Sequence, residues 1–304
     1  MNRNLAYLLL TLTALFWAGN AIVARGLHQD ISPIALAFSR WALASVLVLP
    51  FAWKRLRRDL PALRAAWPAV LFLTLLGISA FNTLLYQAAQ TTSATNIALV
   101  QSTMPAAIVA FGFLLFGERL SPRGIFAVVL TMAGAAVVIG RGNPSLLGQD
   151  WVAGDLWMLS AVVVYALYSV LLRKRPRVHG LSFVAATFVL GTLLLAPLAL
   201  WDWSRNGAPA PTPAVLIGIG YVGVFPSILA YLFWNHGVAT VGPDRAGLFI
   251  CLIPLFTSAL ATVWLDESLQ GYHVAGLLLV LGGFVLFERS EARRRRREHR
   301  VERP

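Results

Sequence analysis

An arginine, Arg40, lies inside a long apolar run of the sequence. A charged side chain in such a run is costly and needs a partner. It lies about eight residues into its run, roughly 12 Å along a helix that rises 1.5 Å per residue. A guanidinium group binds carboxylates through paired hydrogen bonds, so Arg40 is a candidate to hold an acidic ligand. The alternative is a structural arginine bonded to the carbonyl groups of a helix C-terminus, and the sequence alone favours that alternative.

Two pairs of side chains recur at helical spacing. Trp17 and Asn20 lie three residues apart, as do Tyr165 and Tyr168, so each pair shares one helix face. Aromatic faces attract ammonium groups, and amides bind polar ones. Together the four side chains would suit a zwitterion in a cavity. The alternatives are an aromatic belt at a membrane interface or ordinary helix packing, although belts belong nearer to the ends of spanning segments.

Further polar side chains interrupt the apolar runs. The candidates for ligand binding are Asn82, Tyr86, Gln101 and Tyr231. An interior amide is not needed for packing alone. The alternative is a set of hydrogen bonds between helices, each of which stabilises a membrane protein by about 0.6 kcal/mol on average.

Two prolines, Pro105 and Pro254, fall in the middle of apolar runs. A proline removes a backbone hydrogen bond from a helix and leaves a carbonyl group free. The two residues are therefore candidate hinges or gating points, with static kinks as the alternative.

The elements that hold these residues must cross a membrane. The chain has 304 residues, of which 58% are hydrophobic and 12% charged, and its mean hydropathy is +0.70. Soluble domains carry about 25% charged residues. The apolar runs are continuous, which excludes the alternating pattern of a membrane β-barrel. Backbone in lipid must be helical when it is not a closed barrel. We predict an all-α polytopic membrane protein with ten transmembrane helices.

The expected spans are Leu5–Ala24, Ile34–Trp53, Trp67–Tyr86, Ala94–Phe116, Gly124–Gly140, Gly154–Leu172, Leu181–Leu200, Ala214–Trp234, Ala246–Leu265 and Tyr272–Phe287.

Basic residues predict the orientation. With a cytoplasmic N-terminus, the inner segments hold 21 of the 25 Lys and Arg residues and the outer loops hold three. Cytoplasmic loops carry such an excess. We therefore expect both termini in the cytoplasm and the protein in the inner, or plasma, membrane. The net charge of +12 then belongs to loop anchors and to a basic cytoplasmic tail at 289–304, so no nucleic-acid partner is expected.

The sequence repeats itself with an offset near 148. The matching segments are 17–20 with 165–168, 103–105 with 252–254, and 116–121 with 265–270. We predict one five-helix repeat at 1–144 and a second at 145–288. Five is odd, so the second repeat crosses the membrane in the inverted direction. Inverted repeats are typical of transporters, with a site at their interface near the membrane midplane.

The two copies resemble the EamA-type domains of the drug/metabolite transporter superfamily over nearly all of residues 5–288. The sharpest matches are Tyr86, Thr91 to Ala94, Pro105, Gly117 to Leu120, and Gly134. The second copy departs from the pattern at Asp266 to Ser268 and at Val238 to Thr240. The resemblance implies inner-membrane export of small metabolites, and the chain looks most like the amino acid exporters, including those for aromatic amino acids.

Missing motifs narrow the expected function. We find no carboxylate in the middle of any span, and proton-coupled pumps usually keep one there. This favours a facilitative carrier that works by alternating access. The alternative is a proton-coupled exporter of drugs or of other metabolites such as nucleosides or sugars.

No phosphate-loop, His-Glu-x-x-His or Cys–His metal pattern occurs, so no cofactor and no metal are expected. A lipid-modifying enzyme would need clustered His, Asp or Glu, and a channel would need charged rings or a carbonyl filter. We expect no enzyme. The partners are a small-molecule substrate and the lipid bilayer, and a monomer could form the whole pathway.

Overall fold

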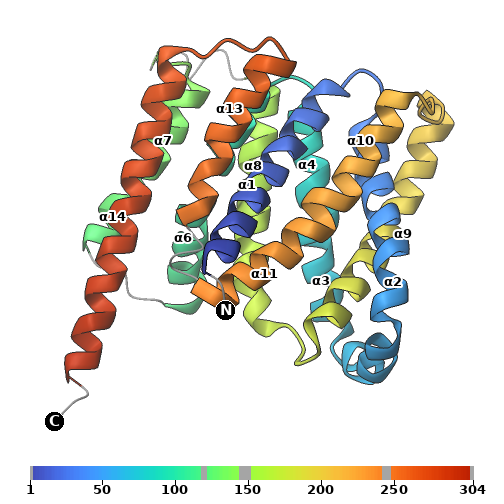
Figure 1. Ribbon diagram of the computed structural model, residues 1–304, viewed down its shortest axis with the longest axis horizontal. Helices are drawn as coiled ribbons and strands as arrows, with labels where there is room; N and C mark the ends of the chain where they lie inside the picture. The colour runs from blue at the N-terminus through green and yellow to red at the C-terminus, as the bar shows by residue number, and fades with distance from the viewer. Residues whose placement is uncertain (1–2, 118–121, 144–151, 242–247, 302–304) are drawn as a thin grey trace.

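The computed structural model describes residues 3–117, 122–143, 152–241 and 248–301, and these residues form helices and connecting turns without any strand (Figure 1). Eight helical segments are long and apolar enough to cross a membrane, and two shorter apolar helices, Leu252–Trp264 and Gly271–Phe287, complete the set. The expected all-α polytopic fold is confirmed.

The first half of the chain contains five helical segments, two of them broken. They are α1 (Arg3–Gly26), α2 (Pro33–Ala65), a third segment built from α3 (Trp67–Thr74), the π-helix η1 (Leu75–Ala80) and α4 (Phe81–Ala88), a fourth built from α5 (Ala94–Gln101) and α6 (Met104–Phe116), and α7 (Pro122–Ile139).

The second half repeats this order. It contains α8 (Ala153–Leu171) with the short η3 (Leu172–Lys174), α9 (Gly180–Asn206), a segment built from α10 (Pro213–Val224), the π-helix η4 (Phe225–Leu229) and α11 (Ala230–Val241), then η5 (Leu248–Cys251) with α13 (Leu252–Trp264), and α14 (Gly271–Val301). A π-helix therefore interrupts the third segment of each half.

Local sequence explains where the helices begin. Ser32, Ser93 and Thr212 each accept a hydrogen bond from the backbone N–H three residues further on, and so cap α2, α5 and α10. Pro33 and Pro213 follow two of these caps at the first helical position, where a proline loses no hydrogen bond.

One helix is longer than the sequence predicts. The second span was expected to end at Trp53, but α2 continues to Ala65 and passes through Pro50 and Pro61. Hydropathy marks only the apolar part of a helix. The polar residues that follow Trp53 extend the same helix beyond that part.

Helices of the two halves pack in reciprocal pairs. α2 packs against α9 at one edge of the molecule, and α7 packs against α14 at the other (Figure 1). Between these edges α1 packs against α11 and α13, while α8 packs against α4, α5 and α6. The first helix of each half thus contacts the third and fourth segments of the other half, as expected if the halves are equivalent.

Small side chains fill the helix contacts and large apolar ones face outward. Ala18, Ala37 and Ala161 are fully buried, which allows helices to approach closely. Large apolar residues such as Phe51 and Ile217 are 81% and 72% exposed, as lipid-facing side chains would be. Both chain termini lie at the same end of the molecule, which we call the proximal end; the distal end holds the turns after α1, α4 and α13 (Figure 1).

Candidate functional site

A cavity of about 270 Å³ lies between the two halves of the chain. Its lining comes from the first, third and fourth segments of each half and from both second helices. Eight of the nine residues that the sequence singled out for ligand binding line it: Trp17, Asn20, Arg40, Asn82, Gln101, Tyr165, Tyr168 and Tyr231. The ninth, Tyr86, lies behind the wall and is 1% exposed.

Arg40 is held by side chains from four segments. Its Nη1 donates to Oδ1 of Asn20 over 3.0 Å, to Oδ1 of Asn82 over 2.8 Å and to the hydroxyl of Tyr86 over 2.9 Å. Its Nε donates to the hydroxyl of Ser227 over 2.7 Å. Its guanidinium carbon lies 4.7 Å from the ring centre of Trp41. The guanidinium group therefore binds neutral side chains and not the carbonyl groups of a helix C-terminus.

The charge on Arg40 has no acidic partner within the described part of the chain. All four of its hydrogen bonds go to neutral groups, and its Nη2 makes none with the described residues. The residue is only 6% exposed, and among the described residues that line the cavity it is the only charged one. A buried charge without a counter-charge is expensive, so a bound anion would be stabilised here.

The first π-helix fixes the orientation of this network. The carbonyl oxygen of Ile78 accepts hydrogen bonds from Nε1 of Trp41 over 3.1 Å and from Nδ2 of Asn82 over 3.1 Å. With its amide nitrogen committed in this way, Asn82 presents its oxygen to Arg40. π-Helices often occur at functional sites because they free carbonyl groups for such contacts.

Sequence reasoning missed two partners of Arg40. Ser227 lies in the second π-helix, and Trp41 follows Arg40 directly. The repeat offset of 148 places Ser227 opposite Ser79, also in a π-helix, and this signal could have identified it.

Aromatic rings form much of the rest of the wall. Trp17 lies 5.5 Å from Trp234, and its Nε1 donates to the carbonyl oxygen of Pro226 over 3.3 Å. Tyr165 lies 4.6 Å from Phe81 and 5.3 Å from Tyr168. The two pairs that the sequence predicted to share a cavity thus face it from α1 and α8.

Both candidate hinge prolines follow a break in a helix. Pro105 lies in the first turn of α6, directly after the turn that separates α5 from α6. Pro254 lies in the first turn of α13, directly after the short 3-10 helix η5. Pro105 lines the cavity, whereas Pro254 does not and only its neighbour Ile253 does.

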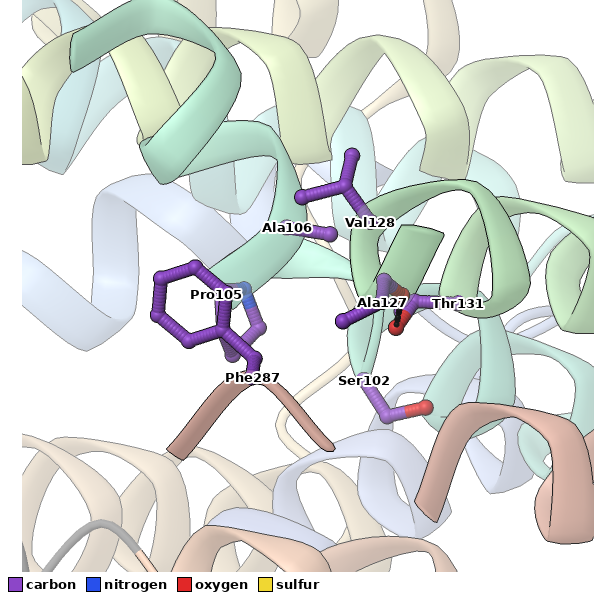
Figure 2. Close-up of a pocket in the computed structure, with 7 residues that line it drawn as sticks. All are labelled: Ser102, Pro105, Ala106, Ala127, Val128, Thr131 and Phe287. Carbon is purple, nitrogen blue, oxygen red and sulfur yellow. Dashed lines mark hydrogen bonds between the residues drawn. The ribbon is translucent and has the colours of Figure 1, made fainter. Parts of the chain in front are cut away.

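A second, much smaller cavity adjoins Pro105 on the outer side of α6. Its volume is about 10 Å³, enough for a single water molecule. Figure 2 shows the side chains that line it, from α6, α7, α14 and the turn before α6. Ser102 and Pro105 line both cavities. The small cavity leaves α6 loosely packed beside the break but is too small for a metabolite.

Hydrogen bonds between segments close the distal end. Arg25 donates to the carbonyl oxygens of Ala89 and Gln90 over 2.8 and 3.1 Å. Glu267 accepts from the backbone N–H groups of Ala94 and Thr95 at the start of α5, and Ser32 donates to Asp202. In the other direction the cavity lining reaches Ile108 and Trp234, toward the proximal ends of α6 and α11.

Groups that could hold a metal ion are missing from the described residues, since no three His, Cys, Asp or Glu side chains come together there. Most of the family-like stretch Gly117 to Leu120 and the start of the expected span Ala246–Leu265 lie outside the described residues.

Comparison with known proteins decides the family. The profile of the EamA-like transporter family matches residues 4–140 and again residues 152–289. The chain belongs to the EamA-like transporter family. This EamA-like transporter is therefore a membrane transporter and not an enzyme, as the sequence predicted.

Relatives of this EamA-like transporter match along almost its whole length. A protein of Archaeoglobus fulgidus named as an uncharacterized transporter is 29% identical over 282 residues, which are 92% of this chain and 96% of the relative. A protein of Streptantibioticus cattleyicolor named as a probable terminal-alkyne amino-acid exporter is 27% identical over 303 residues, 97% of both chains. A solved crystal structure with 21% identity superposes with a TM-score of 0.63 over 94% of this chain and 96% of the other, which shows the shared fold.

Proposed function

We propose that this EamA-like transporter exports amino acids, aromatic ones among them, across the inner membrane by alternating access between its two halves. The observation that carries this proposal is the buried guanidinium of Arg40, which lines the cavity without an acidic partner among the described residues. An α-carboxylate is the counter-charge that this group lacks, and Nη2 is the donor of Arg40 that makes no hydrogen bond with the described residues.

The aromatic residues of the cavity wall suit the ammonium group and the side chain of an amino acid. The rings of Trp17, Tyr165 and Tyr168 offer faces to an ammonium group and apolar surface to a side chain. The volume of about 270 Å³ is at the small end of the range for small-molecule sites, roughly 300–1,000 Å³. It suits a metabolite better than a bulky drug.

Substrates without a negative charge fit less well. A nucleoside or a sugar would leave the charge on Arg40 uncompensated after removing the water around it. The described lining also contains no Asp, Glu or His that could carry a proton with the substrate. These features support facilitative transport of an anionic or zwitterionic metabolite over the proton-coupled alternative.

Export is supported by the direction of the cavity. The excess of basic residues predicts that the proximal end faces the cytoplasm. The lining extends toward this end, while hydrogen bonds join the segments at the distal end. A cavity of this shape loads from the cytoplasm. The relative named as a probable amino-acid exporter agrees with this direction. The cavity lies within one chain, so a monomer suffices.

The proposal can be tested with purified protein in liposomes. Uptake of labelled phenylalanine without an ion gradient should be saturable. Competitors that each lack one group then locate the carboxylate contact: 3-phenylpropionate lacks the amine, and phenethylamine lacks the carboxylate. We expect phenethylamine to compete about tenfold or more weakly than phenylalanine, since a hydrogen bond to a charged group contributes roughly 1.5–3 kcal/mol. Equal competition by both, or uptake only with a proton gradient, would contradict the proposal.

A further inference from the structure

A second buried charge-bearing group lies outside the cavity, at the distal end. Asp155, in the first turn of α8, is 0% exposed. Its Oδ1 accepts a hydrogen bond from the hydroxyl of Thr92 over 2.5 Å and one from Nδ2 of Asn96 over 3.4 Å. Both donors come from the other half of the chain. Asp155 thus joins the two halves where the distal end is closed.

The other carboxyl oxygen of Asp155 has no partner. Oδ2 is buried and makes no hydrogen bond among the described residues. A carboxylate carries a full charge over both oxygens, and burying it with one oxygen unbonded is costly. The neutral acid carries no charge to remove from water, so its burial at this position costs less.

Close packing keeps water away from Asp155. A Cβ atom added to the neighbouring Gly154 would lie 2.5 Å from the carbonyl oxygen of Ala88 and 2.7 Å from the backbone nitrogen of Thr92. Only glycine lets α8 approach the turn between α4 and α5 so closely. Opening of the distal end would separate this contact. Water would then reach both oxygens and stabilise the charged form, which the N-terminus of α8 favours in either state.

The direction of Asn96 is set by a histidine. Nδ1 of His273 accepts a hydrogen bond from the backbone N–H of Gln270, so its Nε2 carries the proton and donates to Oδ1 of Asn96 over 3.0 Å. Asn96 therefore turns its NH₂ group toward Asp155. His273 is neutral in this arrangement, because both of its ring nitrogens have the roles of a neutral imidazole.

Other titratable groups surround Asp155 at longer range than Thr92 and Asn96. Arg141, which follows α7, attracts a negative charge on Asp155. Tyr272 lies in the first turn of α14, and Glu267 lies in the turn between α13 and α14. Thr92, in the turn between α4 and α5, and Asn96, in α5, do not titrate, and Glu267 is bonded to the start of α5. Among these described groups, Asp155 is the one that is buried with an oxygen unbonded.

We propose that Asp155 is a proton-binding site that controls closure of the distal end. The carboxylate takes up a proton from the distal compartment as the end closes and releases it to the same compartment as the end opens. Because the proton enters and leaves on one side, no net proton crosses the membrane. The pH of the distal compartment then sets how fast the transporter cycles without driving transport. This inference rests on the proposed alternating access, but it concerns a separate site.

The test measures closure without any substrate. Spin labels are placed at Gln90→Cys and Gln270→Cys, in the two distal turns, in a Cys251→Ser background that removes the only native cysteine. Distances between the labels are measured by pulsed electron paramagnetic resonance at about pH 5 and about pH 9. Both pH values lie above the ordinary aspartate pKa of about 3.9, so a solvated carboxylate would stay charged at both, and they lie on either side of the ordinary histidine pKa of about 6.5. We expect a short distance at low pH and a larger open population at high pH. Asp155→Asn, which mimics the neutral acid, should give the short distance at both pH values.

Control variants separate Asp155 from its neighbours. Glu267→Gln and His273→Gln should keep the pH dependence, and Thr92→Val should shift its midpoint without removing it. The proposal is overturned if the distance does not change with pH, if Asp155→Asn still responds to pH, or if His273→Gln removes the response. If Asp155→Asn does not fold, Thr92→Val takes its place in the test. The proposal is then overturned if the midpoint of the pH dependence in Thr92→Val equals that of the protein without this substitution.

A second arm tests the one-sided path of the proton. Vesicles that enclose a pH-sensitive dye should show no change in internal pH during amino acid uptake. A proton moved with each substrate would overturn one-sided binding. Failure to transport any amino acid would overturn the proposed function and leave the spin-label result standing.

Discussion

Arg40 and Asn82 fix each other at the wall of the central cavity. Nη1 of Arg40 donates to Oδ1 of Asn82 over 2.8 Å, and Nδ2 of Asn82 donates to the carbonyl oxygen of Ile78 over 3.1 Å. The amide thus offers Arg40 an acceptor without a charge. This leaves the counter-charge to be supplied by a ligand.

Replacing that amide by a carboxylate should block the site. Asn82→Asp would give Arg40 an internal partner in the place of a substrate carboxylate. We expect the affinity for phenylalanine to fall by about tenfold to a hundredfold, the equivalent of a charged hydrogen bond. Thermal stability should change little, because the new ion pair with Arg40 offsets the lost hydrogen bond to the carbonyl oxygen of Ile78. Binding by isothermal calorimetry and melting of the purified protein measure both. Asn82→Ala is the control, and tight binding by the Asp variant would show that Arg40 does not meet the carboxylate.

Removing an aromatic side chain from the cavity wall should impair transport more than folding. Trp17→Ala and Tyr168→Ala each delete a ring that faces the cavity. We expect kcat/KM to fall by about threefold to thirtyfold, in line with the energies of cation–π contacts. Fluorescence size exclusion gives the amount of folded protein in the same membranes. Losses of activity and of folded protein in equal proportion would mean that the rings only pack.

A glycine beneath Tyr168 should control the size of the accepted side chain. A Cβ atom on Gly77 would lie 2.6 Å from two ring carbons of Tyr168, so Gly77→Ala must push this ring away from its position in the cavity wall. We expect aromatic amino acids to compete less well and alanine to be little affected. Gly220→Ala is the matched control, because a Cβ atom there meets nothing within 4 Å. A uniform loss for all substrates would contradict this prediction.

The break in the helix between α5 and α6 should affect the turnover rate of the transporter. Pro105→Ala restores a backbone donor next to the turn between α5 and α6 and favours one continuous helix. We expect a lower kcat with KM little changed, measured as exchange of labelled amino acid. Pro213→Ala, at the first position of α10, serves as a comparison because a proline there does not break a helix. Similar effects of both substitutions would remove the case for a hinge.

Much of the fold followed from periodic and compositional signals. Continuous apolar runs located the helices, and the offset near 148 related Trp17 and Asn20 to Tyr165 and Tyr168, which now line one cavity. The π-helices were not predicted, because the residues of Leu75–Ala80 have no local feature that distinguishes this form from an α-helix. Ser227 was missed because a lone serine in an apolar run has no companion at helical spacing.

Burial near a helix end could not be predicted from sequence either. Asp155 falls near the outer edge of the expected span Gly154–Leu172, and nothing in the local sequence indicates that it is buried. Its complete burial arises from the turn between α4 and α5, a segment about 60 residues earlier in the chain, as the 63-residue separation of its bond to Thr92 shows. Contacts of this kind depend on the packing of whole helices, which local patterns do not encode.

The partners of α1 have a consequence for synthesis of the chain. Nε1 of Trp17 donates to the carbonyl oxygen of Pro226, 209 residues later, and the hydroxyl of Tyr221 donates to the carbonyl oxygen of Phe16, 205 residues earlier. At roughly 5–20 residues per second, a ribosome needs about 10–40 s to make that stretch. During this interval the indole N–H of Trp17 lies in the bilayer without this acceptor. Nascent chains stalled before Pro226 should therefore be the form that membrane quality-control proteases recognise.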